Sequence, residues 1–101
     1  MNPKFWGMLG LAQRAGKLAV GQEKAAEAVR NGGAVLLLLA EDASANTEKK
    51  VRDMSRFYEV PVLSPGDRVK IGSAIGRESA VVAAVTDSGF SQQLLRLAEM
   101  E

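Results

Sequence analysis

Residues 34–40 read Ala-Val-Leu-Leu-Leu-Leu-Ala, a continuously apolar run bounded by Gly33 and by the polar pair Glu41-Asp42. A run of this length suits a β-strand buried on both faces better than a helix. Such a strand needs other elements to cover both of its faces. We therefore expect residues 34–40 to form the central strand of a sheet that has helices on both sides.

Helical and strand-like patterns alternate along the rest of the chain. The helical segments begin at a capping residue or a glycine and space their apolar residues three or four apart. The expected helices are about residues 3–15, the segment between Gly21 and Gly32, a segment capped at Asn46 or Thr47 that runs to Tyr58, residues 64–76 with Ser64 as cap, and a last helix capped near Asp87 or Ser88. The other expected strands are residues 17–20, 60–63 and 80–85.

This alternation predicts an α/β fold, a three-layer α-β-α sandwich around a small and mostly buried sheet of about four strands. The helix that follows Gly21 has a narrow stripe of small apolar residues, which predicts close packing against the sheet. With 101 residues, of which 47% are hydrophobic and 25% charged, the chain is expected to form one domain over residues 1–101.

The absence of cysteine and histidine removes most enzyme mechanisms, because thiolate metal sites, imidazole bases and Cys or Ser/His nucleophile pairs are excluded. Glu41-Asp42 follow the central strand at the end where α/β sheets gather ligands, but without a third acid they are better explained as a solvated cap. The stretch Gly-Ser-Ala-Ile-Gly falls within a helical pattern, unlike a phosphate loop. We expect no enzymatic activity, no metal and no cofactor.

The apolar stretch near the start is broken by two glycines and is too short for a membrane span or an ordinary secretory signal. The expected location is the cytoplasm, without a membrane partner, and a monomer is the default. Thirteen basic and twelve acidic side chains give a net charge of +1, so any basic patch must be local.

Such a patch is expected near the start of the second helix. Arg14 and Lys17 precede the short strand that leads to Gly21 and Lys24, so folding is expected to gather these cations near one helix N-terminus. Backbone N–H groups at a helix start bind phosphate, and Gln or Glu side chains there can read base edges. The alternative is a solvated helix end, since the helix dipole also favours Glu near an N-terminus.

Three motifs then resemble a known family. The stretches LGLAQRAGK, LAEDAS followed by TEKKVRD, and IGSAIGR with TDSGF are similar, in this order and spacing, to the YlxQ-like bacterial branch of the kink-turn-binding ribosomal protein family. The resemblance runs from about Leu9 to Phe90 and implies an α-β-α sandwich. It also implies binding to a kink-turn, an internal RNA loop with sheared G·A pairs that bends the duplex and exposes base edges.

In this family the RNA contacts come from a Gly-Thr-Asn-Glu-x-x-Lys helix start and from the loop after the fourth helix. Here the matching glycine is Gly21, and different residues occupy the other positions of the helix start. The residues that the resemblance and the local charge together predict as RNA-binding are Arg14, Lys17, Gly21, Gln22, Glu23, Lys24, Glu27, Arg77, Glu78, Ser79 and Ala80.

The predicted function is therefore that of an RNA-binding, ribosomal-protein-like chain that recognises kink-turn RNA, with the ribosome as a further expected partner. The alternative is a protein-interaction module of the translation or transcription machinery that keeps the family fold but has little RNA affinity. The departures between Gln22 and Glu27 favour this alternative.

Overall fold

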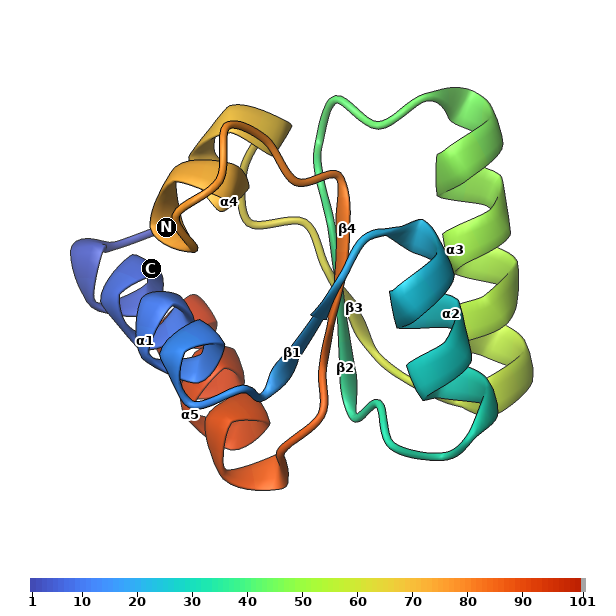
Figure 1. Ribbon diagram of the computed structural model, residues 1–101, viewed down its shortest axis with the longest axis horizontal. Coiled ribbons are helices and arrows are strands. Elements are labelled where there is room, and N and C mark those ends of the chain that lie inside the picture. Colours follow the sequence, from blue (N-terminus) through green and yellow to red (C-terminus); the bar gives the residue numbers. More distant parts are fainter. Residues whose placement is uncertain (101) are drawn as a thin grey trace.

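The computed structural model describes residues 1–100, in which helices and strands alternate as the sequence predicts (Figure 1). In chain order the elements are α1 (Pro3–Arg14), β1 (Leu18–Val20), α2 (Gln22–Arg30), β2 (Leu36–Leu39), α3 (Ala45–Tyr58), β3 (Val62–Leu63), α4 (Arg68–Ala74), β4 (Val82–Val85) and α5 (Ser88–Glu99).

The four strands form one mixed sheet in the order β1-β4-β2-β3. β2 pairs in parallel with β3 and antiparallel with β4, and β4 in turn pairs antiparallel with β1. Every residue of β2 and β4 is buried, because both strands lie between two others and helices cover both faces of the sheet. The expectation that the Leu-rich run forms a central strand is confirmed, within the narrower bounds Leu36–Leu39.

Helices cover both faces of the sheet, with α1, α4 and α5 on one face and α2 and α3 on the other (Figure 1). Alternate residues of β2 serve the two cores: Leu36 and Leu38 pack with the first group of helices, and Leu37 and Leu39 with the second. This alternation follows from the two-residue period of a strand. The three-layer α-β-α sandwich predicted from the sequence is therefore confirmed.

Two predicted helix starts are wrong. The cap of α3 is Ser44, whose side chain accepts a hydrogen bond from the backbone N–H of Thr47, so neither Asn46 nor Thr47 is the cap. α4 is capped by Asp67 instead of Ser64. The segment before Asp67 follows the sheet, since the carbonyl of Gly66 accepts a hydrogen bond from the N–H of Glu41 at the end of β2.

Of the two caps predicted for α5, Asp87 is confirmed, and α1 is capped by Asn2. Asn2 accepts a hydrogen bond from the N–H of Phe5, and Asp87 accepts one from the N–H of Phe90. Within residues 1–100, no helix has the length and apolar character that crossing a membrane requires.

Candidate nucleic-acid interface

The pairing of β1 with β4 brings together the two segments that the sequence predicts as contact sites. β4 runs antiparallel to β1, so the residues that precede β4 lie beside those that follow β1. The N–H of Gly21 donates to the carbonyl of Val82 at 2.9 Å, which fixes the start of α2 next to the start of β4. Between them lies a groove of about 340 Å³, the edge groove, which is lined by Val20, Gly21, Gln22, Thr47, Arg77, Ser79, Ala80, Val81 and Val82.

Gly21 gives the edge groove an open helix start. Its φ of 105° and ψ of 153° lie in a region that only glycine adopts readily, and no atom lies within 4 Å of the position that a Cβ would take. The other helices have an Asn, Ser or Asp side chain that accepts a hydrogen bond from their first turn, whereas α2 has none. Backbone donors at the start of α2 are therefore not occupied by a cap and face an accessible groove.

The loop between α4 and β4 is held in place by close contact with α4. The N–H of Arg77 donates to the carbonyl of Gly72 at 2.8 Å, and a Cβ on Gly72 would lie 2.6 Å from the Cα of Ser79. Gly76 follows the C-cap residue of α4, Ile75, and turns the chain away from the helix with a φ of 78°. The two glycines thus serve the packing and the exit of α4, which supports the sequence-based rejection of a phosphate loop.

Within this loop Arg77, Glu78 and Ser79 are exposed, but Ala80 is buried. The N–H of Ala80 donates to the carbonyl of Arg68, and its side chain packs in the core beneath α1, α4 and α5. Ala80 therefore contributes to the floor of the edge groove, and the exposed part of the loop is Arg77–Ser79.

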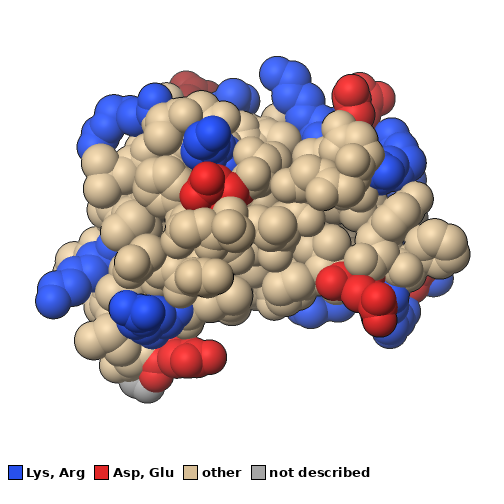
Figure 2. All heavy atoms as spheres, turned by 90° about the horizontal axis from the view of Figure 1, so that it is seen from below, with Lys and Arg blue, Asp and Glu red and all other residues tan. Residues whose placement is uncertain are grey.

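The expectation that Arg14 and Lys17 gather at the start of α2 is wrong. The carbonyl of Lys17 accepts a hydrogen bond from the N–H of Thr86, which follows β4, so Lys17 lies at the opposite end of β1 from Gly21. Arg14 ends α1 just before it. Three strand residues separate the two ends, at roughly 3.3 Å per residue. That end of the molecule is seen in Figure 2, where charged side chains are scattered around the rim and the centre is mostly uncharged.

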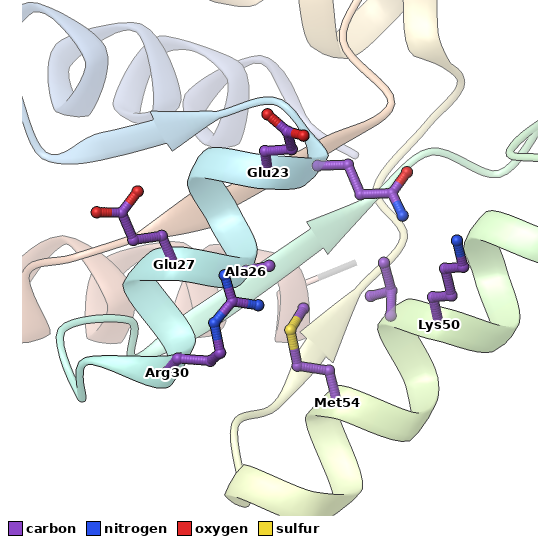
Figure 3. A pocket seen from close by; sticks show the side chains of 8 residues that line it. Glu23, Ala26, Glu27, Arg30, Lys50 and Met54 are labelled. Carbon is purple, nitrogen blue, oxygen red and sulfur yellow. The ribbon is translucent and has the colours of Figure 1, made fainter.

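The polar residues of α2 lie along exposed faces of the helix. Glu23 and Glu27 point to the same side of α2, as their four-residue spacing predicts (Figure 3). Gln22 and Lys24 are also exposed. Within residues 1–100, neither Glu23, Lys24 nor Glu27 forms an ion pair, so their charges are available to a ligand.

A second, larger groove of about 740 Å³, the helix groove, lies between α2 and α3 (Figure 3). Its lining residues are Gln22, Glu23, Ala26, Glu27, Arg30, Lys50, Val51 and Met54. Gln22 lines both grooves, so the helix groove and the edge groove adjoin at this residue. The RNA-binding residues predicted from the sequence do not include Arg30, Lys50 or Met54.

Asp42, considered above as a possible acid, holds two elements together. Its carboxylate accepts hydrogen bonds from the backbone N–H and the Nε of Arg68, at 2.9 and 3.1 Å. Desolvation alone raises the pKa of Asp42, but these hydrogen bonds and the Arg68 charge outweigh it and leave the pKa below its ordinary value. Asp42 therefore ties the loop after β2 to Arg68, the first residue of α4. No group of three or more potential metal ligands occurs among residues 1–100.

Thr47 is the residue of the edge groove that the sequence analysis did not include among the contacts. It lies in the first turn of α3 and is half-buried between the start of α2 and the 77–79 loop. Its place follows from the neighbouring positions of β2 and β4, because the end of β2 then lies beside the start of β4. The alternating pattern alone does not specify this strand order.

Comparison with known proteins identifies the family of this chain. The profile of the ribosomal protein L7Ae/L30e/S12e/Gadd45 family matches residues 4–95. The chain belongs to this family. Among its relatives in the family is the RNA-binding protein YlxQ of Bacillus subtilis, which is 45% identical over 93% of this chain and 94% of its own length. The large ribosomal subunit protein eL30 of Methanosarcina mazei is 33% identical over 82% of this chain and 79% of its own.

These values confirm the expected YlxQ-like branch of the family, since the similarity to the Bacillus protein exceeds that to the archaeal one. Among solved structures, the 15.5kD RNA binding protein of Giardia lamblia superimposes with a TM-score of 0.79, covering 99% of this chain and 92% of its own. At 17% identity this similarity bears on the fold alone, and it agrees with the three-layer sandwich of this family member.

Proposed function

We propose that this member of the L7Ae/L30e/S12e/Gadd45 family binds structured RNA of the kink-turn type through the edge groove. One observation carries the proposal: the two segments that the family resemblance names, the start of α2 and the 77–79 loop, line one groove although more than fifty residues separate them. Two relatives are named as RNA-binding proteins, which supports RNA as the ligand.

The groove has the chemistry that a bent internal loop requires. The start of α2 offers uncapped backbone donors beside Gln22 and Glu23, whose side chains can hydrogen-bond to exposed base edges. Arg77 lines the groove and Lys24 is exposed in the first turn of α2, so both cations can meet phosphates. A straight A-form duplex presents few base edges to such a groove, because its major groove is narrow. Binding should therefore depend on RNA shape.

We further propose that the protein acts as a monomer in the cytoplasm, in the context of ribosomes or their assembly, and that it binds without catalysing a reaction. The family to which it belongs supports the ribosomal context. A titration with RNA tests the central point. A duplex that contains a kink-turn and a fully paired duplex of the same length should differ clearly in affinity.

The salt dependence of the kink-turn complex gives a second readout. With Lys24 and Arg77 as the cations beside the edge groove, the log–log slope of affinity against salt should be about −2. Equal affinity for the two duplexes would contradict the proposal, since binding would then rest on charge alone.

The alternative function, a protein-interaction module, is favoured by a different feature. Phe57 is 80% exposed and forms an edge-to-face pair with Tyr58, with ring centroids 4.9 Å apart, at the end of α3. Exposed aromatic residues are typical anchors of protein interfaces. If Phe57→Ser abolishes a protein contact while the wild-type chain shows no RNA affinity, the alternative replaces the first proposal.

A further inference from the structure

We infer that the helix groove between α2 and α3 binds a single-stranded RNA segment that continues from the RNA held in the edge groove. This inference rests on the proposed function and assigns a second part of the ligand. Its starting point is that the two grooves adjoin at Gln22, which lines both of them. An RNA strand that passes Gln22 on leaving the edge groove enters the space between α2 and α3.

The charges along the helix groove favour this occupant. The other cations of α3 are neutralised along the helix: Lys49 and Arg56 both pair with Asp53, and Arg52 pairs with Glu48. Lys50 has no such partner within residues 1–100, and neither has Arg30 of α2. Both cations that line the groove are thus without an ion pair within residues 1–100.

Figure 3 shows which of the side chains that line the groove point into it. Arg30 and Met54 point into the space between the helices, whereas Glu23 and Glu27 point to the side of α2 that faces away from α3. The carboxylates therefore lie at the outer rim. The groove itself combines cations with an apolar floor that includes Ala26, buried Val51 and half-buried Met54.

A single strand of RNA matches this arrangement, because it alternates anionic phosphates with flat, largely apolar bases. The space between two packed helices is too narrow to admit a duplex. Lys50 and Arg30 would meet phosphates, and a base would lie on Met54. An acidic protein segment would also complement the two cations, but the position next to the edge groove favours RNA.

The test compares kink-turn duplexes with blunt ends against the same duplexes carrying a single-stranded uridine tail of about six nucleotides at one end or the other. The quantity of interest is the gain in affinity that the tail provides. One of the two tails should raise the affinity of the wild-type chain at least about fivefold, the effect of one stacked base. The same tail should make the salt slope more negative by about 0.7 for each phosphate contacted.

Lys50→Gln should remove most of this gain, and Lys49→Gln is the matched control. Both lysines are exposed and adjacent in α3, and both changes remove one positive charge, but Lys49 is paired with Asp53 and does not line the groove. Lys49→Gln should therefore keep the gain. Thermal unfolding of both variants checks that neither change alters the fold.

The outcomes separate the inference from the proposed function. If neither tail increases the affinity, or if both variants lose the gain equally, the inference is overturned while kink-turn binding by the edge groove stands. If the helix groove instead binds a protein partner, Lys50→Gln should leave every RNA affinity unchanged. That result would also overturn the inference. If the blunt kink-turn duplex binds no better than a paired duplex, the proposed function itself fails, and the inference fails with it.

Discussion

Gly72 and Ser79 lie so close that a Cβ atom added to Gly72 would come within 2.6 Å of the Cα of Ser79. Because the atoms in the way belong to the backbone, Gly72→Ala must displace either α4 or the 77–79 loop. We expect this variant to lose about 1–3 kcal/mol of unfolding free energy, the usual cost of overpacking, and to bind kink-turn RNA more weakly. Urea unfolding and RNA titration measure the two effects. Ser73→Ala, at an exposed position of the same helix, is the control.

Gly21→Ala tests the open helix start. A Cβ meets nothing within 4 Å at this position, so the cost arises from the φ of 105° and should be about 1–3 kcal/mol of unfolding free energy. Gly7→Ala is the matched control, because Gly7 also has free space but lies within α1, where alanine should stabilise by about 0.4–1 kcal/mol.

Gly21→Val extends the same experiment to RNA binding. It should strain the backbone at least as much as alanine and, in the fraction that remains folded, hinder the approach of RNA to the start of α2. A folded Gly21→Val protein with wild-type RNA affinity would show that Gly21 serves the turn only.

Glu27→Lys tests whether the exposed side of α2 meets phosphate. Glu27 shares this side with Glu23, and within residues 1–100 neither has an ion-pair partner (Figure 3). The change should therefore increase kink-turn affinity and make the salt slope more negative by about one. Glu99→Lys makes the same change of charge on α5, across the sheet, and should have little effect. If the two variants behave alike, this side of α2 is not an RNA contact.

Asp42→Asn tests the contact between the end of β2 and the start of α4. Hydrogen bonds and the charge of Arg68 lower the pKa of Asp42 below its ordinary 3.8, so its stabilising effect is present above that pH and is lost as the pH falls below it. The variant should be less stable at pH 7 and should lose less stability between pH 4 and pH 2. Urea midpoints at several pH values measure this difference. Equal acid sensitivity of both proteins would contradict it.

The layers of this fold could be predicted because two patterns of apolar residues are clear in the sequence. The fully apolar Leu36–Leu39 run requires cover on both faces, and the helices show apolar residues three or four apart. Two helix starts were misplaced because several capping residues occur within a few positions of each other. Which of them caps depends on tertiary hydrogen bonds, such as that between Glu41 and Gly66.

The site could be predicted only in part, since strand order decides which residues meet. Gly21 and Arg77 share a groove because β1 pairs with β4, and the same pairing carries Lys17 to the other end of the sheet. Because Lys17 is close to Gly21 in the sequence, the two residues were expected to lie together in the fold. The sequence likewise does not reveal that Lys50 lacks an ion-pair partner within residues 1–100, because Lys50 is one of several cations in α3.

Strand β1 lies at the edge of the sheet and is held by β4 on one side only, over three residues. Short edge strands open more readily than central ones, so their amide hydrogens exchange with solvent sooner. A ligand that fills the edge groove touches Val20 of β1 and Val82 of β4 and must oppose the separation of these strands. Bound RNA would then slow amide exchange at Gly21 and along β1 far more than in the already protected β2, and would make this edge of the sheet as slow to open as its centre.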